Sequence, residues 1–179
     1  MVPQEKISKF LTYVLRHRPH DVPLEFDERG FVAWAELRAA VQRRFPDATE
    51  EEILQVVQES DKRRFELKDG KARATYGHSF PVDLAAEPTL PPARLYHGTA
   101  RDLAETIVRT GLKPRDRQFV HLSASLEDAL AVGRRRDPLP AVVVVEARAA
   151  ADEGLKFYAS GPLFLTSEVP AKYLSLWRR

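Results

Sequence analysis

A proline-rich stretch from Phe80 to Ala93 limits how this chain can fold more than any other feature does. It holds four prolines, which lack a backbone N–H donor and disfavour helix, at Pro81, Pro88, Pro91 and Pro92. We therefore predict a linker at residues 80–93, between a first domain at 1–79 and a second at 94–179. A chain of 179 residues is long enough for two small domains that share a cleft.

The first part is predicted to form three helices and a hairpin. Apolar residues recur with helical spacing over residues 7–15 and 34–45. Thr49, with Glu52 three residues later, is a capping-box signature for a third helix. Residues 68–71 then have the turn composition of a hairpin between two short β-prone runs. Three helices followed by a hairpin are typical of a winged-helix module.

The second part alternates short strands with short helices. Strands are predicted at 94–96, 119–122, 141–147 and 163–166, and helices at 101–110 and 125–132. Taken alone, this alternation is compatible with a doubly wound parallel sheet. The sequence contains neither GxGxxG nor GxxxxGK[ST], so it gives no support to a Rossmann or P-loop nucleotide site.

Composition argues against metal, disulfide and membrane chemistry. The chain has no cysteine, and its five histidines show no HxxxH spacing, so we expect no metal. It has no apolar run of the roughly 18 residues that would span a bilayer, and its start lacks the apolar segment of a signal peptide. We expect a cytoplasmic protein that makes no membrane contact.

Arginines gather in clusters although the net charge is only +2. The clusters are Arg16-His17-Arg18, Arg43-Arg44, Lys62-Arg63-Arg64, Arg115 with Arg117, and Arg134-Arg135-Arg136. A solvated helix face explains any one of them. Cations at the end of a helix are also favoured by its dipole, by about 0.3–1 kcal/mol. Two such corners in one small module could instead converge on a phosphate, for which arginine is the natural ligand.

Two apolar strands of the second part end in a histidine and a hydroxyl residue. Tyr96-His97-Gly98-Thr99 and Val120-His121-Leu122-Ser123 share this arrangement. A lone histidine in such a place is usually a satisfied structural group, but here the pattern repeats. Glycine permits a close backbone approach, and the other side chains suit ribose hydroxyls and a carboxamide.

The ordered set of motifs resembles the tRNA 2'-phosphotransferases known as Tpt or KptA, from about Ser8 to Tyr173. The matching segments are Ser8-Lys9-Phe10-Leu11, Leu15-Arg16-His17, Ser60-Asp61-Lys62-Arg63-Arg64-Phe65, Arg73-Ala74, Gly77-His78-Ser79, Leu95-Tyr96-His97-Gly98-Thr99, Gly111-Leu112, Arg117, Val120-His121-Leu122-Ser123, Val132-Gly133, Arg135 and Leu165-Thr166. The sequence departs from the family pattern in two places. Tyr76 replaces a usual Gln, and Arg136-Asp137 replace a usual His-Gly.

The resemblance implies an α+β fold in which an N-terminal winged-helix module, binding the RNA phosphate, packs on an ADP-ribosyltransferase-like split β-sheet domain, antiparallel and mixed. It implies a catalytic group of Arg16, His17, Arg64 and Arg117. It places NAD, a co-substrate, at His97, Gly98, Thr99, His121 and Ser123. The partner would be an RNA bearing a 2'-phosphate, tRNA-like or other, and a monomer is compatible with the sequence.

The implied reaction passes the RNA 2'-phosphate to the ADP-ribose of NAD, which gives 2'-hydroxyl RNA, nicotinamide and ADP-ribose 1'',2''-cyclic phosphate. One alternative is a mono-ADP-ribosyltransferase acting on protein or nucleic acid. Many such enzymes carry a glutamate on a late strand, whereas residues 160–166 offer Leu163 and no carboxylate. The other alternative is a non-catalytic winged-helix regulator, which would bind duplexes tightly and sequence-specifically.

Overall fold

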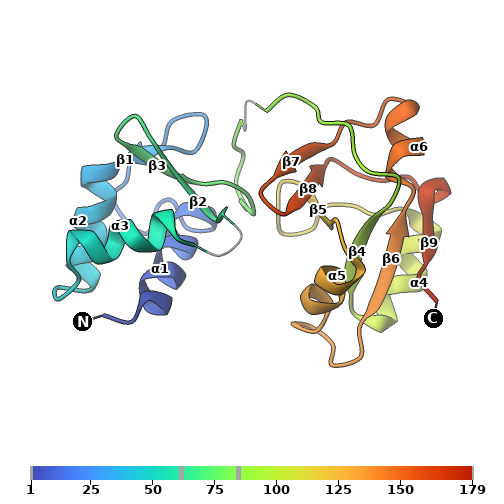
Figure 1. Ribbon diagram of the computed structural model, residues 1–179, viewed down its shortest axis with the longest axis horizontal. Helices are drawn as coiled ribbons and strands as arrows, with labels where there is room; N and C mark the ends of the chain where they lie inside the picture. Colours follow the sequence, from blue (N-terminus) through green and yellow to red (C-terminus); the bar gives the residue numbers. More distant parts are fainter. Residues whose placement is uncertain (1, 61–62, 84–85, 179) are drawn as a thin grey trace. The chain divides into compact units, whose positions relative to one another are not determined.

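The computed structural model describes residues 2–60, 63–83 and 86–178, and the chain divides into two compact units, 1–85 and 86–179 (Figure 1). Each unit is described by itself. The division falls within the proline-rich stretch, whose described residues, 80–83 and 86–93, form neither helix nor strand. Within the described residues, no helix is both long and apolar enough to span a bilayer.

The described part of the first unit contains three α-helices, as predicted: α1 (Gln4–Arg16), α2 (Trp34–Arg44) and α3 (Glu50–Gln58). The capping box ahead of α3 is confirmed. The Thr49 side chain accepts from the N–H of Glu52, and the Glu52 carboxylate accepts from the N–H of Thr49.

A three-stranded antiparallel sheet completes this unit. Its strands β1 (Val32–Ala33), β2 (Phe65–Lys68) and β3 (Lys71–Ala74) lie in the order β1-β3-β2. The predicted hairpin joins β2 to β3 through Asp69 and Gly70, whose φ values of 50° and 71° suit a two-residue turn.

Apolar side chains from the helices and the sheet form the core of the first unit. Its buried members include Ile7, Leu11, Val14, Leu15, Leu37, Val41, Ile53, Val57 and Phe65. The last apolar side chain of α1, that of Leu15, lies in this core, so the end of α1 is fixed where the cationic residues begin.

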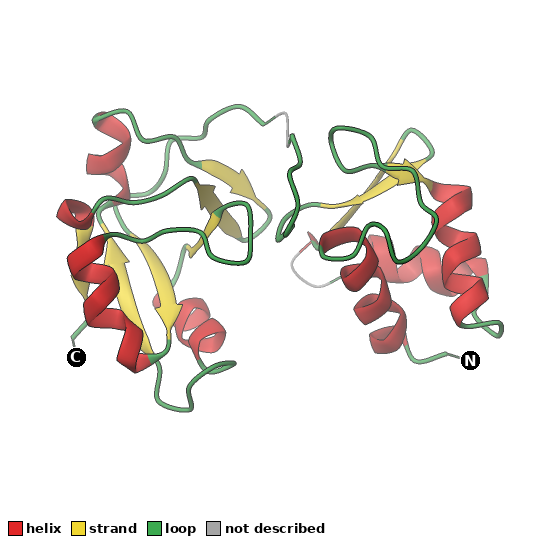
Figure 2. Cartoon of the chain, turned by 180° about the vertical axis from the view of Figure 1, so that it is seen from behind, coloured by secondary structure: helices red, strands yellow, loops and turns green. Residues whose placement is uncertain are grey.

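The second unit holds a six-stranded sheet with three helices and a short 3-10 turn. The strands are β4 (Leu95–Thr99), β5 (Val120–Ser123), β6 (Ala141–Val145), β7 (Tyr158–Ser160), β8 (Leu163–Thr166) and β9 (Leu174–Leu176). The helices are α4 (Arg101–Thr110), α5 (Leu126–Gly133) and α6 (Ala147–Asp152), and the turn is Ala171–Tyr173. Figure 2 shows helices along the sheet of this unit.

Every strand pairing in the described chain is antiparallel, so the doubly wound parallel alternative is wrong, as are the parallel pairs that a mixed sheet would contain. The strand order is β7-β8-β5-β4-β6-β9. Alternation of elements does not fix strand direction, because pairing joins segments far apart in the sequence, such as β4 and β6.

The middle of this sheet is weakly joined. Five residue pairs connect β4 to β6 and four connect β5 to β8, whereas β4 and β5 share the single pair Tyr96 and Ser123. The sheet is therefore two three-stranded halves that meet at one point, and the residues after Tyr96 on β4 diverge from those before Ser123 on β5.

Candidate functional site

Arg16, His17 and Arg18 form a cationic corner at the end of α1, and the first of them is buried. Arg16 is 7% exposed, and its guanidinium lies over the Tyr76 ring, 4.5 Å from the ring centroid. A cation on an aromatic face is stabilised by the ring quadrupole, most strongly where water is excluded. Tyr76, one of the two departures from the family pattern, thus supports an expected catalytic residue.

Gly77 packs against the same arginine. Its φ of +87° is a conformation that a side chain strains, and a Cβ there would lie 3.3 Å from Arg16 Cδ and 3.4 Å from Arg16 Nη1. A side chain at position 77 would therefore strain the backbone and crowd the Arg16 side chain.

Ser79 joins this segment to the end of α1. Its N–H donates to the Arg16 carbonyl at 2.8 Å, and its hydroxyl lies 3.2 Å from that carbonyl and 3.3 Å from His17 Nδ1. The exposed His17 imidazole and the buried Arg16 side chain are thus both held by residues 76–79. Sequence alone gave the motif Gly77-His78-Ser79 but not these contacts.

His78, between Gly77 and Ser79, is a buried neutral histidine. Burial, and after it the positive charges of Arg16, Arg73 and His17, together lower its pKa from 6.5 to about 4. Its ring meets Phe80 edge to face, and among the described residues its Nε2 has no hydrogen-bond partner. The neutral form is required here, since a second buried charge would sit beside Arg16.

Arg64 is anchored at its backbone and at its guanidinium. Its N–H donates to the Ser60 hydroxyl at 3.1 Å, its carbonyl accepts from Thr75 N–H at 3.0 Å, and its Nη1 lies 3.4 Å from the Ser8 hydroxyl on α1. Ser8 precedes Arg16 by two turns, or roughly 12 Å along the helix. Asp61 and Lys62, part of the motif before Arg64, lie outside the described residues.

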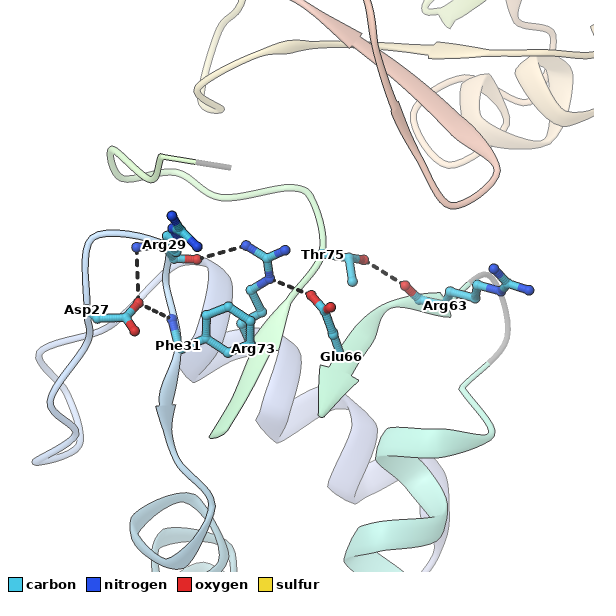
Figure 3. Close-up of polar contacts among 7 residues, drawn as sticks. All are labelled: Asp27, Arg29, Phe31, Arg63, Glu66, Arg73 and Thr75. Carbon is cyan, nitrogen blue, oxygen red and sulfur yellow. Dashed lines mark hydrogen bonds and ion pairs between the residues drawn. The ribbon is translucent and has the colours of Figure 1, made fainter. Parts of the chain in front are cut away.

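Polar contacts around β3 brace the segments beside this corner (Figure 3). The Thr75 hydroxyl donates to the Arg63 carbonyl at 2.6 Å, and Arg63 has a φ of 45°. Arg73 pairs with Glu66 at 2.7 Å and donates to the Arg29 carbonyl at 3.2 Å. These contacts fix the backbone that carries Arg29 and Arg63, whose side chains are exposed.

His97 in the second unit lies on β4, just past the pair that joins the two halves of the sheet. Its Nδ1 donates to the His121 carbonyl on β5 at 3.1 Å. Burial lowers the pKa of His97, Arg136 and Arg115 lower it as well, and the bond to His121 opposes them. In its neutral form His97 therefore carries the proton on Nδ1, which leaves Nε2 as a hydrogen-bond acceptor.

His121 has the same tautomer. Its Nδ1 lies 2.9 Å from the Phe119 carbonyl, which can only accept, so Nδ1 carries the proton in the neutral ring. Thr99 and Ser123, on β4 and β5, are both buried, at 5% and 4% exposure. The strands β4 and β5 thus carry two histidines whose Nε2 is an acceptor in the neutral ring, and two buried hydroxyls.

From the sequence we expect Gly98 to let the backbone approach a ligand closely. The structure shows that Gly98 also lets α5 approach one face of β4. A Cβ there would lie 1.8 Å from the carbonyl oxygen of Ala129 and 2.9 Å from the N–H nitrogen of Gly133, both in α5. The missing side chain is what allows α5 to pack on β4. Contact between Gly98 and a ligand stays a prediction.

Arg117 and the triple-arginine segment are exposed parts of the second unit. Arg117 lies in the segment that leads into β5. Residues 134–136 follow α5, and Asp137 accepts from the N–H groups of Arg101 and Leu139, both at 2.9 Å. Asp137 belongs to the pair of residues that departs from the family pattern, and its carboxylate thus connects this loop to the start of α4.

Comparison with known proteins identifies the family. The model of the RNA 2'-phosphotransferase, Tpt1 / KptA family matches residues 2–168. The chain belongs to this family. It is 40% identical to a probable RNA 2'-phosphotransferase of Acetivibrio thermocellus over 97% of each chain. It is also 45% identical to one of Agrobacterium fabrum over 94% of this chain and 92% of the relative, and 44% identical to one of Pyrococcus abyssi over 87% and 85%.

Family membership confirms the resemblance drawn from the motifs, and the fold agrees with it at the level of an α+β chain with two antiparallel sheets. No cluster of three or more His, Asp or Glu side chains that could hold a metal occurs in the described ranges. Among the candidate residues, those of the first unit are two arginines and a histidine, whereas those of the second are two histidines, a glycine, two hydroxyl residues and the exposed Arg117.

Proposed function

We propose that this chain transfers the 2'-phosphate of an RNA to the ADP-ribose part of NAD, giving 2'-hydroxyl RNA, nicotinamide and ADP-ribose 1'',2''-cyclic phosphate. The observation that carries the proposal is the family match over residues 2–168, together with relatives named probable RNA 2'-phosphotransferase. The enzyme is a transferase. A tRNA-like substrate, a cytoplasmic location and a monomer belong to the same proposal.

The first unit is the proposed winged-helix domain for the RNA phosphate. Its helices α1 to α3 are followed by the β2–β3 hairpin. Arg16 and Arg64, held on this scaffold, supply the bidentate donors that a phosphate dianion prefers, and His17 lies next to Arg16. We propose that Arg117 of the second unit is a further catalytic residue.

The second unit is the proposed ADP-ribosyltransferase-like domain for NAD, with a split sheet as its core. His97 and Thr99 lie on β4 just past the pair that joins it to β5, Ser123 belongs to that pair, and His121 precedes it on β5. Their acceptor nitrogens and hydroxyls match the donors and acceptors of the ribose next to nicotinamide, and Gly98 belongs to the same strand.

The first chemical step needs placement more than proton transfer. A phosphate oxygen bonds to the ribose C1'' carbon, and the bond from that carbon to nicotinamide breaks. The phosphate is already anionic, so no base is required. Neutral His97 suits this step, since an imidazolium would oppose the positive charge that develops on the ribose.

The second step places more negative charge on phosphorus. The 2''-oxygen bonds to phosphorus and loses its proton, the bond from phosphorus to the RNA 2'-oxygen breaks, and that oxygen gains a proton. The arginines stabilise the added charge, and His17 moves the proton or holds the phosphate.

The test is to incubate the pure protein with NAD and a short RNA carrying one internal 2'-phosphate. We expect 2'-hydroxyl RNA and ADP-ribose cyclic phosphate in equal amounts, and no reaction with the matched RNA that lacks the 2'-phosphate. Transfer of labelled ADP-ribose to protein, with the RNA phosphate intact, would instead identify a mono-ADP-ribosyltransferase. Binding of duplexes without turnover would identify a regulator.

A further inference from the structure

Ser79 occupies a place from which it can control the His17 ring. Its hydroxyl lies 3.3 Å from His17 Nδ1, 3.2 Å from the Arg16 carbonyl and 3.5 Å from the His17 carbonyl. A hydroxyl has one proton to donate and two lone pairs that accept. Both carbonyls can only accept, so they compete for the Ser79 proton.

The shorter carbonyl contact favours one use of the hydroxyl. If its proton is directed to the Arg16 carbonyl, the shorter of the two carbonyl contacts, the hydroxyl faces the imidazole as an acceptor. His17 Nδ1 must then be the donor. The neutral ring has one N–H, so Nε2 holds the lone pair, as it does in His97 and His121, where backbone carbonyls impose the same tautomer.

The position of Ser79 is itself well fixed. Its N–H bond to Arg16 is 2.8 Å long, and the preceding residues are buried against α1. Gly77 touches the Arg16 side chain, and the His78 ring packs on Phe80. These contacts hold the Ser79 backbone at the end of α1, so that its exposed hydroxyl is presented to the His17 ring.

We propose that Ser79 is the positioning residue for His17: it fixes the imidazole as the Nδ1–H tautomer, so that Nε2 is the atom that exchanges a proton with the substrate in the second step. The catalytic part of this inference rests on the proposed function. In that step Nε2 takes the proton of the 2''-hydroxyl as the new bond to phosphorus forms. It returns a proton to the RNA 2'-oxygen as the old bond breaks, so the enzyme ends in its starting form.

The structural part is tested without any reaction. Two-bond 1H–15N spectra of the full chain show which ring nitrogen carries the proton, and His17→Gln identifies the His17 signals. At a pH where His17 is neutral, we expect the Nδ1–H form in the parent and a shift towards Nε2–H, which an unconstrained imidazole prefers, in Ser79→Ala. Ser79→Thr, which keeps the hydroxyl, should retain the parent tautomer. Parent and Ser79→Ala spectra with the same tautomer would overturn the proposal.

The catalytic part is tested with 2'-phosphorylated RNA and NAD under single-turnover conditions. We expect Ser79→Ala to slow the second step by up to about 10²-fold, the scale of a misplaced catalytic group, and to leave nicotinamide release close to the parent rate. Ser79→Thr should restore most of the rate, and Ser175→Ala, which changes an exposed serine on β9, should have no effect.

The two parts fail in different ways. If the parent makes no cyclic phosphate, the proposed function is wrong, while the tautomer measurement still decides the link between Ser79 and His17. If the tautomer changes in Ser79→Ala but both steps keep the parent rate, His17 does not act through Nε2 and the proposal is overturned. The melting temperature of each variant shows whether the first unit is folded. A variant that loses both steps because this unit is unfolded is recognised in this way.

Discussion

The two units hold their polar groups by different means. In the first, side chains hold side chains: the Tyr76 ring lies under Arg16, and the hydroxyls of Ser79 and Ser8 contact His17 and Arg64. In the second, the backbone sets the positions, through carbonyls that fix His97 and His121. A substitution in the first unit should therefore disturb one group at a time, whereas one in the second should disturb the packing of strands and helices.

The largest effect is expected from Gly98→Ala. The new methyl group would meet the backbone of α5 at 1.8 Å, and backbone cannot turn away as a side chain can. We expect a loss of about 3 kcal/mol or more in unfolding free energy, at the upper end for overpacking. Denaturant unfolding, followed by Trp177 in a Trp34→Phe background, measures it.

The control for this substitution is Gly70→Ala in the β2–β3 turn. A Cβ there meets nothing within 4 Å, so only the positive φ opposes it, at a cost of about 1 kcal/mol. Equal losses in the two variants would show that α5 does not depend on the missing side chain.

The second prediction concerns acid. The unfolded chain protonates His78 at its usual pKa of 6.5, whereas the folded first unit resists protonation until about pH 4. The stability linked to this group is therefore complete above pH 6.5 and is lost as the pH falls towards 4, by at most about 3 kcal/mol. Unfolding followed by Trp34 in a Trp177→Phe background, between pH 7 and 4, should show this slope.

His78→Gln, which does not titrate, should remove that slope, while the acid sensitivity that comes from the carboxylates remains. If His78→Gln has the same slope as the parent, the folded unit protonates His78 as readily as the unfolded chain does, and the prediction is wrong.

A smaller effect is expected from the ring beneath Arg16. Tyr76→Leu keeps an apolar side chain but removes the aromatic face, which is worth about 1–2 kcal/mol to a buried guanidinium, or roughly tenfold in kcat/KM for the RNA. Tyr76→Phe keeps the face and should stay close to the parent rate. If Leu and Phe have the same kcat/KM, the ring does not support Arg16.

The smallest effect is expected from Ser8→Ala. The contact from Arg64 Nη1 to the Ser8 hydroxyl is long, at 3.4 Å, so its loss should reduce kcat/KM for the RNA only about two- to threefold. Ser175→Ala is the matched control. A loss above about tenfold would mean that α1 positions Arg64 far more strictly than this contact indicates.

Much of the fold could be predicted because the signals for it are local. The limits of α4 and β8 match the predicted ranges, and the capping box at Thr49 fixed the start of α3. The strands β1, β7 and β9 were missed, because segments of two or three residues carry too little pattern to detect. Strand direction was not predictable either, since it depends on pairs distant in sequence.

The candidate site shows the same division between local and distant information. The motifs located the candidate residues, but Tyr76 seemed only a departure from the family pattern until the structure placed it under Arg16. The need for glycine at position 98 likewise depends on α5, 31 residues further on at Ala129. Contacts between distant segments leave no periodic signal in the sequence.

The central claim is that arginines of both units serve the second step of one reaction, and Arg64→Ala and Arg117→Ala test it most directly. Transesterification adds negative charge at phosphorus, and removing one preorganised donor typically costs about 10²- to 10³-fold. With 2'-phosphorylated RNA and NAD, each variant should accumulate RNA carrying 2'-phospho-ADP-ribose, seen as a slower band on a denaturing gel, while the parent shows little of it. If substrate persists in both variants and no such band appears, the arginines bind the RNA phosphate equally in all states and the claim is wrong.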